Sequence, residues 1–216
     1  MHRMARSLGL AALVTIALWP AAANAQVFGQ FTGGSILPMG KNAIGGYVEL
    51  SSNLIGVMGQ VRSSFQEKTD FGFQGGVGIY EQGDNNVTAV RLGADFRMLA
   101  RPRDERVKFD LVFGAGIGVE TGDNLNILRL GPSLIAAMPA GGSPENPRFR
   151  PFGGVELLFN REQVHDENRS GLTMPVHLGT EWTVATGVKL YAELQWRVGN
   201  EFGDQTAIST GITSTF

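Results

Sequence analysis

The sequence predicts a closed, antiparallel, up-and-down β-barrel that crosses a membrane. The first indication is the segment Val188–Val198, where apolar and polar residues alternate strictly over a length that suits a bilayer-spanning strand. The second is that this pattern recurs along the chain, with the charged residues on one face of each segment. Strands of this kind place their apolar side against lipid and their polar side in the barrel lumen. The third is the terminal aromatic residue, Phe216, at the end of the last alternating segment.

The beginning of the chain has the pattern of a signal peptide. Arg3 and Arg6 give a basic start, and an apolar run over residues 8–19 leads to the small-residue sequence Ala-Asn-Ala at 23–25. The apolar run is short for a transmembrane helix. We therefore expect residues 1–25 to be removed and the mature chain to begin at Gln26.

Composition narrows the class of protein. The 216 residues carry a formal charge of −2 at pH 7, which gives no electrostatic reason to expect nucleic acid as a partner. The chain has no cysteine, so an exported fold cannot depend on disulfides. Its 30 glycines and 13 phenylalanines suit curved strands and aromatic side chains at a membrane interface. If the mature chain spans a membrane, only a closed barrel pairs all of its strand backbone in lipid.

Alternation places the strands in order along the chain. Two weaker candidates come first, around residues 44–50 and 55–65. Eight clearer strands follow, at residues 71–79, 90–98, 107–119, 127–138, 149–159, 172–184, 188–198 and 206–216. The total is ten strands, an even number as in bacterial barrels, and eight strands is the alternative. We assign residues 42–216 to the barrel and residues 26–41 to an N-terminal periplasmic segment.

The connections between these strands predict the orientation. Turn sequences at 83–86, 122–124 and 203–204, rich in Gly, Asp and Asn, fall at one end of the ten-strand scheme. The longest expected loop, the highly charged segment 160–171, falls at the same end. With the C-terminus in the periplasm, this end is extracellular. The connections at 100–106 and 139–147 are then periplasmic.

The polar faces of the strands predict a charged lumen. A barrel of eight to ten strands is narrow, and side chains largely fill it. Charges of both signs there favour a paired network that plugs the lumen over an open path for ions or solutes. The predicted lumen network consists of Glu49, Arg62, Arg91, Asp95, Arg97, Lys108, Asp110, Arg129, Arg150, Glu156, His177, Glu181, Lys189, Glu193 and Arg197.

No catalytic, cofactor or metal site is predicted. His177 and Glu181 share a strand face, but a metal or acid–base site needs more converging groups. Gly179 stands where the His-x-Ser motif of a lipid A deacylase barrel needs its serine. His165 and Asp166 lie on an outer loop, as acidic and histidine pairs do in omptin-type barrel proteases, but no second pair accompanies them.

With these features the chain resembles the small outer-membrane β-barrel proteins of Gram-negative bacteria, the opacity-protein-like and OmpA-like group. The resemblance rests on the signal peptide, the alternating strands from Phe71 onward and the terminal Phe216. It implies an outer-membrane location, contact with outer-membrane lipid, and an assembly signal formed by Ile212 and Phe216 that the outer-membrane barrel assembly machinery reads. It says little about activity, because such barrels support many functions on one scaffold.

From these observations we expect a structural or surface-facing role, without catalysis, for a barrel whose lumen is largely plugged by charged side chains. The alternative is a small porin-like channel for small or hydrophobic solutes. A third and weaker hypothesis is a barrel enzyme acting on lipid or peptide. The sequence makes no prediction of the oligomeric state.

Overall fold

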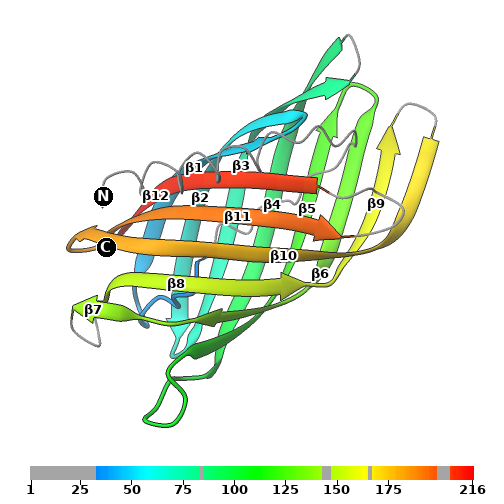
Figure 1. Ribbon diagram of the computed structural model, residues 1–216. Coiled ribbons are helices and arrows are strands. Elements are labelled where there is room, and N and C mark those ends of the chain that lie inside the picture. Colours follow the sequence, from blue (N-terminus) through cyan, green and yellow to red (C-terminus); the bar gives the residue numbers. More distant parts are fainter. Residues whose placement is uncertain (1–32, 83–84, 143–146, 165–166, 199–204) are drawn as a thin grey trace, which may run out of the picture.

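The computed structural model describes residues 33–82, 85–142, 147–164, 167–198 and 205–216, which form one closed antiparallel β-barrel (Figure 1). The predicted signal peptide and the tips of several predicted turns lie outside these residues. The strand segments are β1 (Asn42–Ser51), β2 (Leu54–Gln66), β3 (Thr69–Gln82), β4 (Asn85–Arg101), β5 (Asp110–Gly122), β6 (Leu125–Ala137), β7 (Ala140–Gly142), β8 (Pro147–Glu156), β9 (Leu158–Val164), β10 (Glu167–Ala185), β11 (Val188–Val198) and β12 (Gln205–Thr215).

Ten strands surround the lumen in the described part of the chain, as the alternation predicts. β8 and β9 together make one of these strands, because both pair with β6 on one side and with β10 on the other. The interruption between them is Leu157, whose N–H donates to the carbonyl of Pro132. β7 is a short additional strand that pairs with β8.

The first and last strands close the barrel. β1 pairs with β12 from Ala43 opposite Thr215 to Ser51 opposite Ala207. Asn42 and Phe216 then exchange two main-chain hydrogen bonds, at 3.0 and 2.9 Å. No edge remains between the first and last strands, which satisfies the main condition for crossing lipid as a sheet.

We call the end of the barrel that holds Asn42 and Phe216 the proximal end, and the opposite end the distal end. The C-terminus, β7 and the turn from β10 to β11 lie at the proximal end, and β9 and β10 extend away from it as one long hairpin (Figure 1). If the termini face the periplasm, as the sequence predicts, the proximal end is periplasmic.

Three connections differ from the sequence prediction. The segment 160–171, expected as a loop, is mostly strand, because β9 continues to Val164 and β10 begins at Glu167. The strand expected from residue 107 begins at Asp110, since residues 102–109 form the connection from β4 to β5. The proximal connection 139–147 contains β7 rather than a simple loop.

The outer surface of the barrel is an apolar belt. Along every long strand alternate residues are exposed and apolar, including Ile55 and Val57 on β2, Leu92 on β4 and Leu178 on β10. Water would make so much exposed apolar surface unfavourable, whereas lipid accommodates it. In the described residues, no helix has the length and apolar character needed to cross a membrane. The polar side chains on the alternate positions point into the lumen, where most are buried.

Candidate functional site: the barrel lumen

The distal half of the lumen holds an alternating chain of acidic and basic side chains, which we call the distal charge cluster. Its members, in spatial order, are Glu49, Arg91, Glu120, Arg129, Glu162 and Arg197, from β1, β4, β5, β6, β9 and β11. All six side chains are buried. Neighbouring members form ion pairs, so each interior charge faces one or two of opposite sign.

Two contacts of the distal charge cluster, Glu49 with Arg91 and Glu162 with Arg197, join strands that are not paired, and the other three join neighbouring strands. Arg91 lies 3.0 Å from Glu49 and 3.3 Å from Glu120. Arg129 pairs with Glu120 and lies 3.5 Å from Glu162, which is 3.4 Å from Arg197. The cluster therefore draws side chains from six of the strands around the lumen.

The middle of the lumen contains a histidine between carboxylates. His177 Nδ1 lies 2.6 Å from Glu193, and its Nε2 lies 3.6 Å from Glu156. Gln195 donates from its amide nitrogen to the same Glu193 carboxylate at 2.7 Å. On the facing wall, the Tyr47 hydroxyl donates to Gln74 at 2.5 Å.

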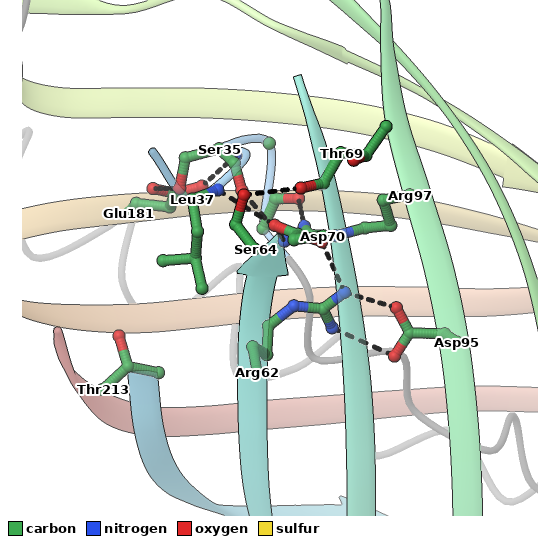
Figure 2. A network of polar contacts seen from close by, with 12 residues as sticks. Ser35, Leu37, Arg62, Ser64, Thr69, Asp70, Asp95, Arg97, Glu181 and Thr213 are labelled. Carbon is green, nitrogen blue, oxygen red and sulfur yellow. Dashed lines mark hydrogen bonds and ion pairs between the residues drawn. The ribbon is translucent and has the colours of Figure 1, made fainter. Parts of the chain in front are cut away.

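A second group of charges, the proximal charge cluster, consists of Arg62, Asp70, Asp95 and Arg97 (Figure 2). Arg62 lies between the two aspartates, 2.8 Å from Asp70 and 2.5 Å from Asp95. Arg97 contacts both oxygens of Asp70, at 2.9 and 2.8 Å. Such fork-to-carboxylate pairs have a fixed geometry and hold their side chains in place.

Two groups of buried apolar side chains also lie inside the barrel wall. At the distal end Leu54, Tyr80, Ala89, Leu125 and Ile127 form a buried cluster. At the proximal end a second one, which we call the proximal apolar cluster, contains Val112, Ile135, Ala137 and Phe152.

Two small cavities lie between lumen side chains in the part of the chain that the structure describes. A cavity beside Arg62, Arg97 and Tyr191 measures about 20 Å³, and one beside Gln74, Arg129 and Glu156 about 10 Å³. Each is close to the size that holds a single water molecule. In the described residues, no group of three or more acidic or histidine side chains is placed to hold a metal ion.

Most residues of the predicted lumen network lie in the lumen. Those that are buried there are Glu49, Arg62, Arg91, Asp95, Arg97, Arg129, Glu156, His177, Glu181, Glu193 and Arg197. Arg150 and Lys189 are half-buried near the proximal end, and Lys189 lies 3.1 Å from Glu181. Asp110 is half-buried at the start of β5, where it accepts a hydrogen bond from the Arg103 N–H at 2.9 Å. Lys108 differs from the prediction: it lies before β5, outside the barrel wall, and is exposed.

Three charged members of the two clusters are absent from the predicted network. Glu120 occupies the same face of β5 as Gly118, so extending the alternation by two residues would find it. Asp70 lies one residue before the predicted start of its strand. Glu162 lies in the segment expected to be a loop, where alternation was not applied.

The N-terminal segment also differs from the prediction. The sequence predicts residues 26–41 in the periplasm; residues 26–32 lie outside the described residues, whereas Gly33 and Gly34 are buried and Ser35 contacts Glu181 inside the proximal end of the lumen (Figure 2). The predicted assembly-signal residues, Ile212 and Phe216, are both exposed on the outer surface.

No protein-family model and no curated protein matches this chain. Solved structures do. An outer membrane channel from Pseudomonas putida F1 superposes with a TM-score of 0.55 at 10% identity, covering 88% of this chain and 100% of that one. LpxR from Salmonella typhimurium gives a TM-score of 0.49 at 10% identity, covering 81% and 99%. The N-terminal barrel domain of OprF from Pseudomonas aeruginosa gives 0.36 at 12% identity, covering 83% and 100%.

At these identities the similarity concerns the fold alone, and only the similarity to the Pseudomonas putida channel is used as evidence for the fold. Together with the apolar belt and the closed sheet, it shows that the chain has the fold of an outer-membrane β-barrel. The sequence prediction of an outer-membrane barrel is confirmed at this level.

Proposed function

We propose that this outer-membrane β-barrel has a structural or surface-facing role and that its own side chains plug its lumen. The observation that carries the proposal is the distal charge cluster, which links side chains of six strands around the lumen, all of them buried. A continuous path for ions needs connected water, and the two cavities described between lumen side chains hold about one water each.

The absence of catalysis is part of the proposal. His177 is buried in the lumen between Glu156 and Glu193. A catalytic group has to reach its substrate. The arrangement of His177 supports a role in the lumen network.

The alternative is a small porin-like channel for small or hydrophobic solutes. The fold similarity to an outer membrane channel is the observation in its favour. Single-channel recording in a planar bilayer separates the two functions. We expect little steady current from the wild-type barrel. A variant that replaces Arg91, Arg129 and Arg197 by Ala removes the three long side chains of the distal charge cluster and should admit water and raise the current.

A large, steady wild-type current, unchanged by the three substitutions, would contradict the plugged lumen and establish the channel.

The predicted outer-membrane location is tested separately. The mature protein should fractionate with outer membranes and migrate differently on gels before and after heating. Recovery as a soluble periplasmic monomer would contradict the membrane assignment. Release of acyl chains from lipid A, or cleavage of a peptide by the purified barrel, would support the enzyme hypothesis instead.

A further inference from the structure

The segment Gly33 to Leu37, which we call the N-terminal strap, lies in the proximal end of the lumen and is bound there by charged side chains of five barrel strands. These side chains are Asp70 on β3, Arg97 on β4, Arg150 on β8, Glu181 on β10 and Lys189 on β11. We call them the strap seat. The strap precedes β1 and is not part of the sheet, so barrel closure alone does not explain these contacts.

The strap seat binds the strap largely through its main chain. The N–H of Ser35 donates to Glu181 at 3.0 Å, and the N–H of Leu37 donates to Asp70 at 2.9 Å. Arg97 donates to the carbonyls of Gly33 and Ser35, at 3.1 and 3.0 Å. Carboxylates thus accept from amides and a guanidinium donates to carbonyls, which is how charged side chains recognise an extended peptide.

Side-chain contacts add selectivity. The hydroxyl of Ser35 donates to Glu181 at 2.8 Å and accepts from Lys189 at 2.8 Å. Ile36 packs against the proximal apolar cluster, which includes Phe152. The seat therefore provides a polar site for a hydroxyl group next to an apolar site for an aliphatic side chain.

Two adjacent glycines fit where larger residues do not. A Cβ on Gly33 would lie 2.3 Å from the Glu181 carboxylate, and the φ angle of +56° there also favours glycine. A Cβ on Gly34 would lie 2.1 Å from the Cβ of Ala137 on the barrel wall. The space in the seat is fitted to a glycine pair.

From these contacts we infer that the proximal lumen is a binding site for an extended, uncharged peptide with two adjacent glycines, a hydroxyl residue and an aliphatic residue. The N-terminal strap occupies it and forms a second closure, separate from the distal charge cluster. The inference extends the proposed function, since it adds a closure that can be released without disturbing the barrel wall.

Thiol labelling tests the bound state of the strap, because the chain contains no cysteine of its own. In the folded, full-length mature protein, an Ile36→Cys variant should react with a bulky maleimide at least about tenfold more slowly than a Met39→Cys variant. Met39 is 60% exposed, just outside the strap. Tenfold corresponds to about 1.4 kcal/mol of protection. Equal rates for the two variants would overturn the inference, and this comparison leaves every seat residue unchanged.

A Gly34→Val substitution should release the strap while leaving the seat intact, because the added methyl groups meet Ala137. In a barrel that also carries Gly34→Val, the maleimide should react with Ile36→Cys as fast as with Met39→Cys. Folding of each variant is checked by its heat-dependent mobility on gels. Persistent protection in a folded Gly34→Val barrel would contradict the proposed fit.

Peptide binding tests the site itself. A fluorescent peptide with the sequence of residues 33–39, GGSILPM, should bind the Gly34→Val barrel saturably and should not bind the wild type, whose seat is filled. The same peptide with valine at its second position should bind neither. Absence of binding to the Gly34→Val barrel, or equal binding to both barrels, would overturn the peptide site.

These results are independent of the proposed function. A conducting wild-type barrel would remove the plugged lumen but would leave the labelling and peptide experiments as tests of the strap. Conversely, an unprotected strap in a barrel that carries no current would leave the distal charge cluster as the plug.

Discussion

Breaking the Arg62–Asp95 ion pair should destabilise the barrel far more than breaking an ion pair on its surface. Arg62 supplies two contacts to Asp95, at 2.5 and 3.0 Å, and the side chains are only 6% and 1% exposed. Replacing Arg62 by Met leaves the Asp95 carboxylate buried without these contacts. The expected loss is about 3–5 kcal/mol, the usual cost of removing one partner from a buried pair.

The energy that belongs to the pair is best measured with a double-mutant cycle. The variants are Arg62→Met, Asp95→Leu and the double substitution, which removes both charges and should cost less than the sum of the single changes. We expect a coupling energy of about 2–3 kcal/mol. Contacts that either residue makes elsewhere, such as that of Arg62 with Asp70, largely cancel in the cycle.

The matched control is the pair formed by Arg101 and Asp104, 3.6 Å apart, with side chains 52% and 54% exposed. Its coupling energy should be about 0.2–1 kcal/mol, because water screens both charges. Both cycles are measured as free energies of unfolding from urea titrations of the barrel in lipid vesicles. If the two coupling energies agree within about 0.5 kcal/mol, the charges in the lumen are not desolvated and the reasoning fails.

Three further predictions concern the wall and its assembly. Gly131→Ala should destabilise the barrel strongly, because the added Cβ would lie 1.9 Å from the Leu157 carbonyl oxygen. Gly46→Ala should have little effect, because its Cβ would lie 3.5 Å from the nearest atom. Equal urea midpoints for the two variants would contradict this. Leu92→Arg, on the exposed apolar belt, should cost about 2–4 kcal/mol in vesicles if it lies near the bilayer centre, and an unchanged free energy of unfolding would show that this face does not meet lipid. Phe216→Ser should lower the amount of barrel assembled in cells, because it removes part of the predicted assembly signal. It should leave refolding in vesicles unchanged, because the main-chain hydrogen bonds to Asn42 remain. Normal assembly in cells would rule out Phe216 as part of the assembly signal.

The barrel strands were predictable because strand periodicity is local. Neighbouring residues such as Leu194 and Gln195 face opposite sides of the sheet whatever their distant partners are. The outer belt and the polar lumen therefore follow from the sequence, and β11 has the predicted bounds, Val188–Val198. Opposite charges on inward faces also indicate pairing, since isolated charges in a narrow lumen are unfavourable.

The alternation of apolar and polar residues could not predict where a strand continues beyond the lipid. Outside the hydrocarbon the outer face meets water, so the charged segment of β9 and β10 keeps its pairing without an apolar outer face. The opposite error occurs at Lys108, where alternation persists although the chain has left the sheet after Arg101.

The strap was beyond sequence reasoning for a different reason. Its residues do not alternate, and the contact between Ser35 and Glu181 joins positions 146 residues apart. Nothing local to Gly33 and Gly34 distinguishes a glycine pair bound in a lumen from one in a free linker. The sequence predicts Arg97 and Glu181 as lumen charges, and Asp70 lies one residue before its predicted strand, but that these side chains bind a peptide main chain depends on the folded barrel.

The pairing of β1 with β12 has a consequence for the kinetics of folding. This ladder joins Ala43 to Thr215, so the strand synthesised first obtains its last neighbour only when the whole chain is present. Contacts of such long sequence separation form slowly. Until then β1 keeps an open edge that can pair with another chain. Arg197 on β11 can also join Glu162 only after β11 has been added. The nascent protein is therefore most prone to aggregate just before its final strand arrives, and closing the sheet removes that exposed edge.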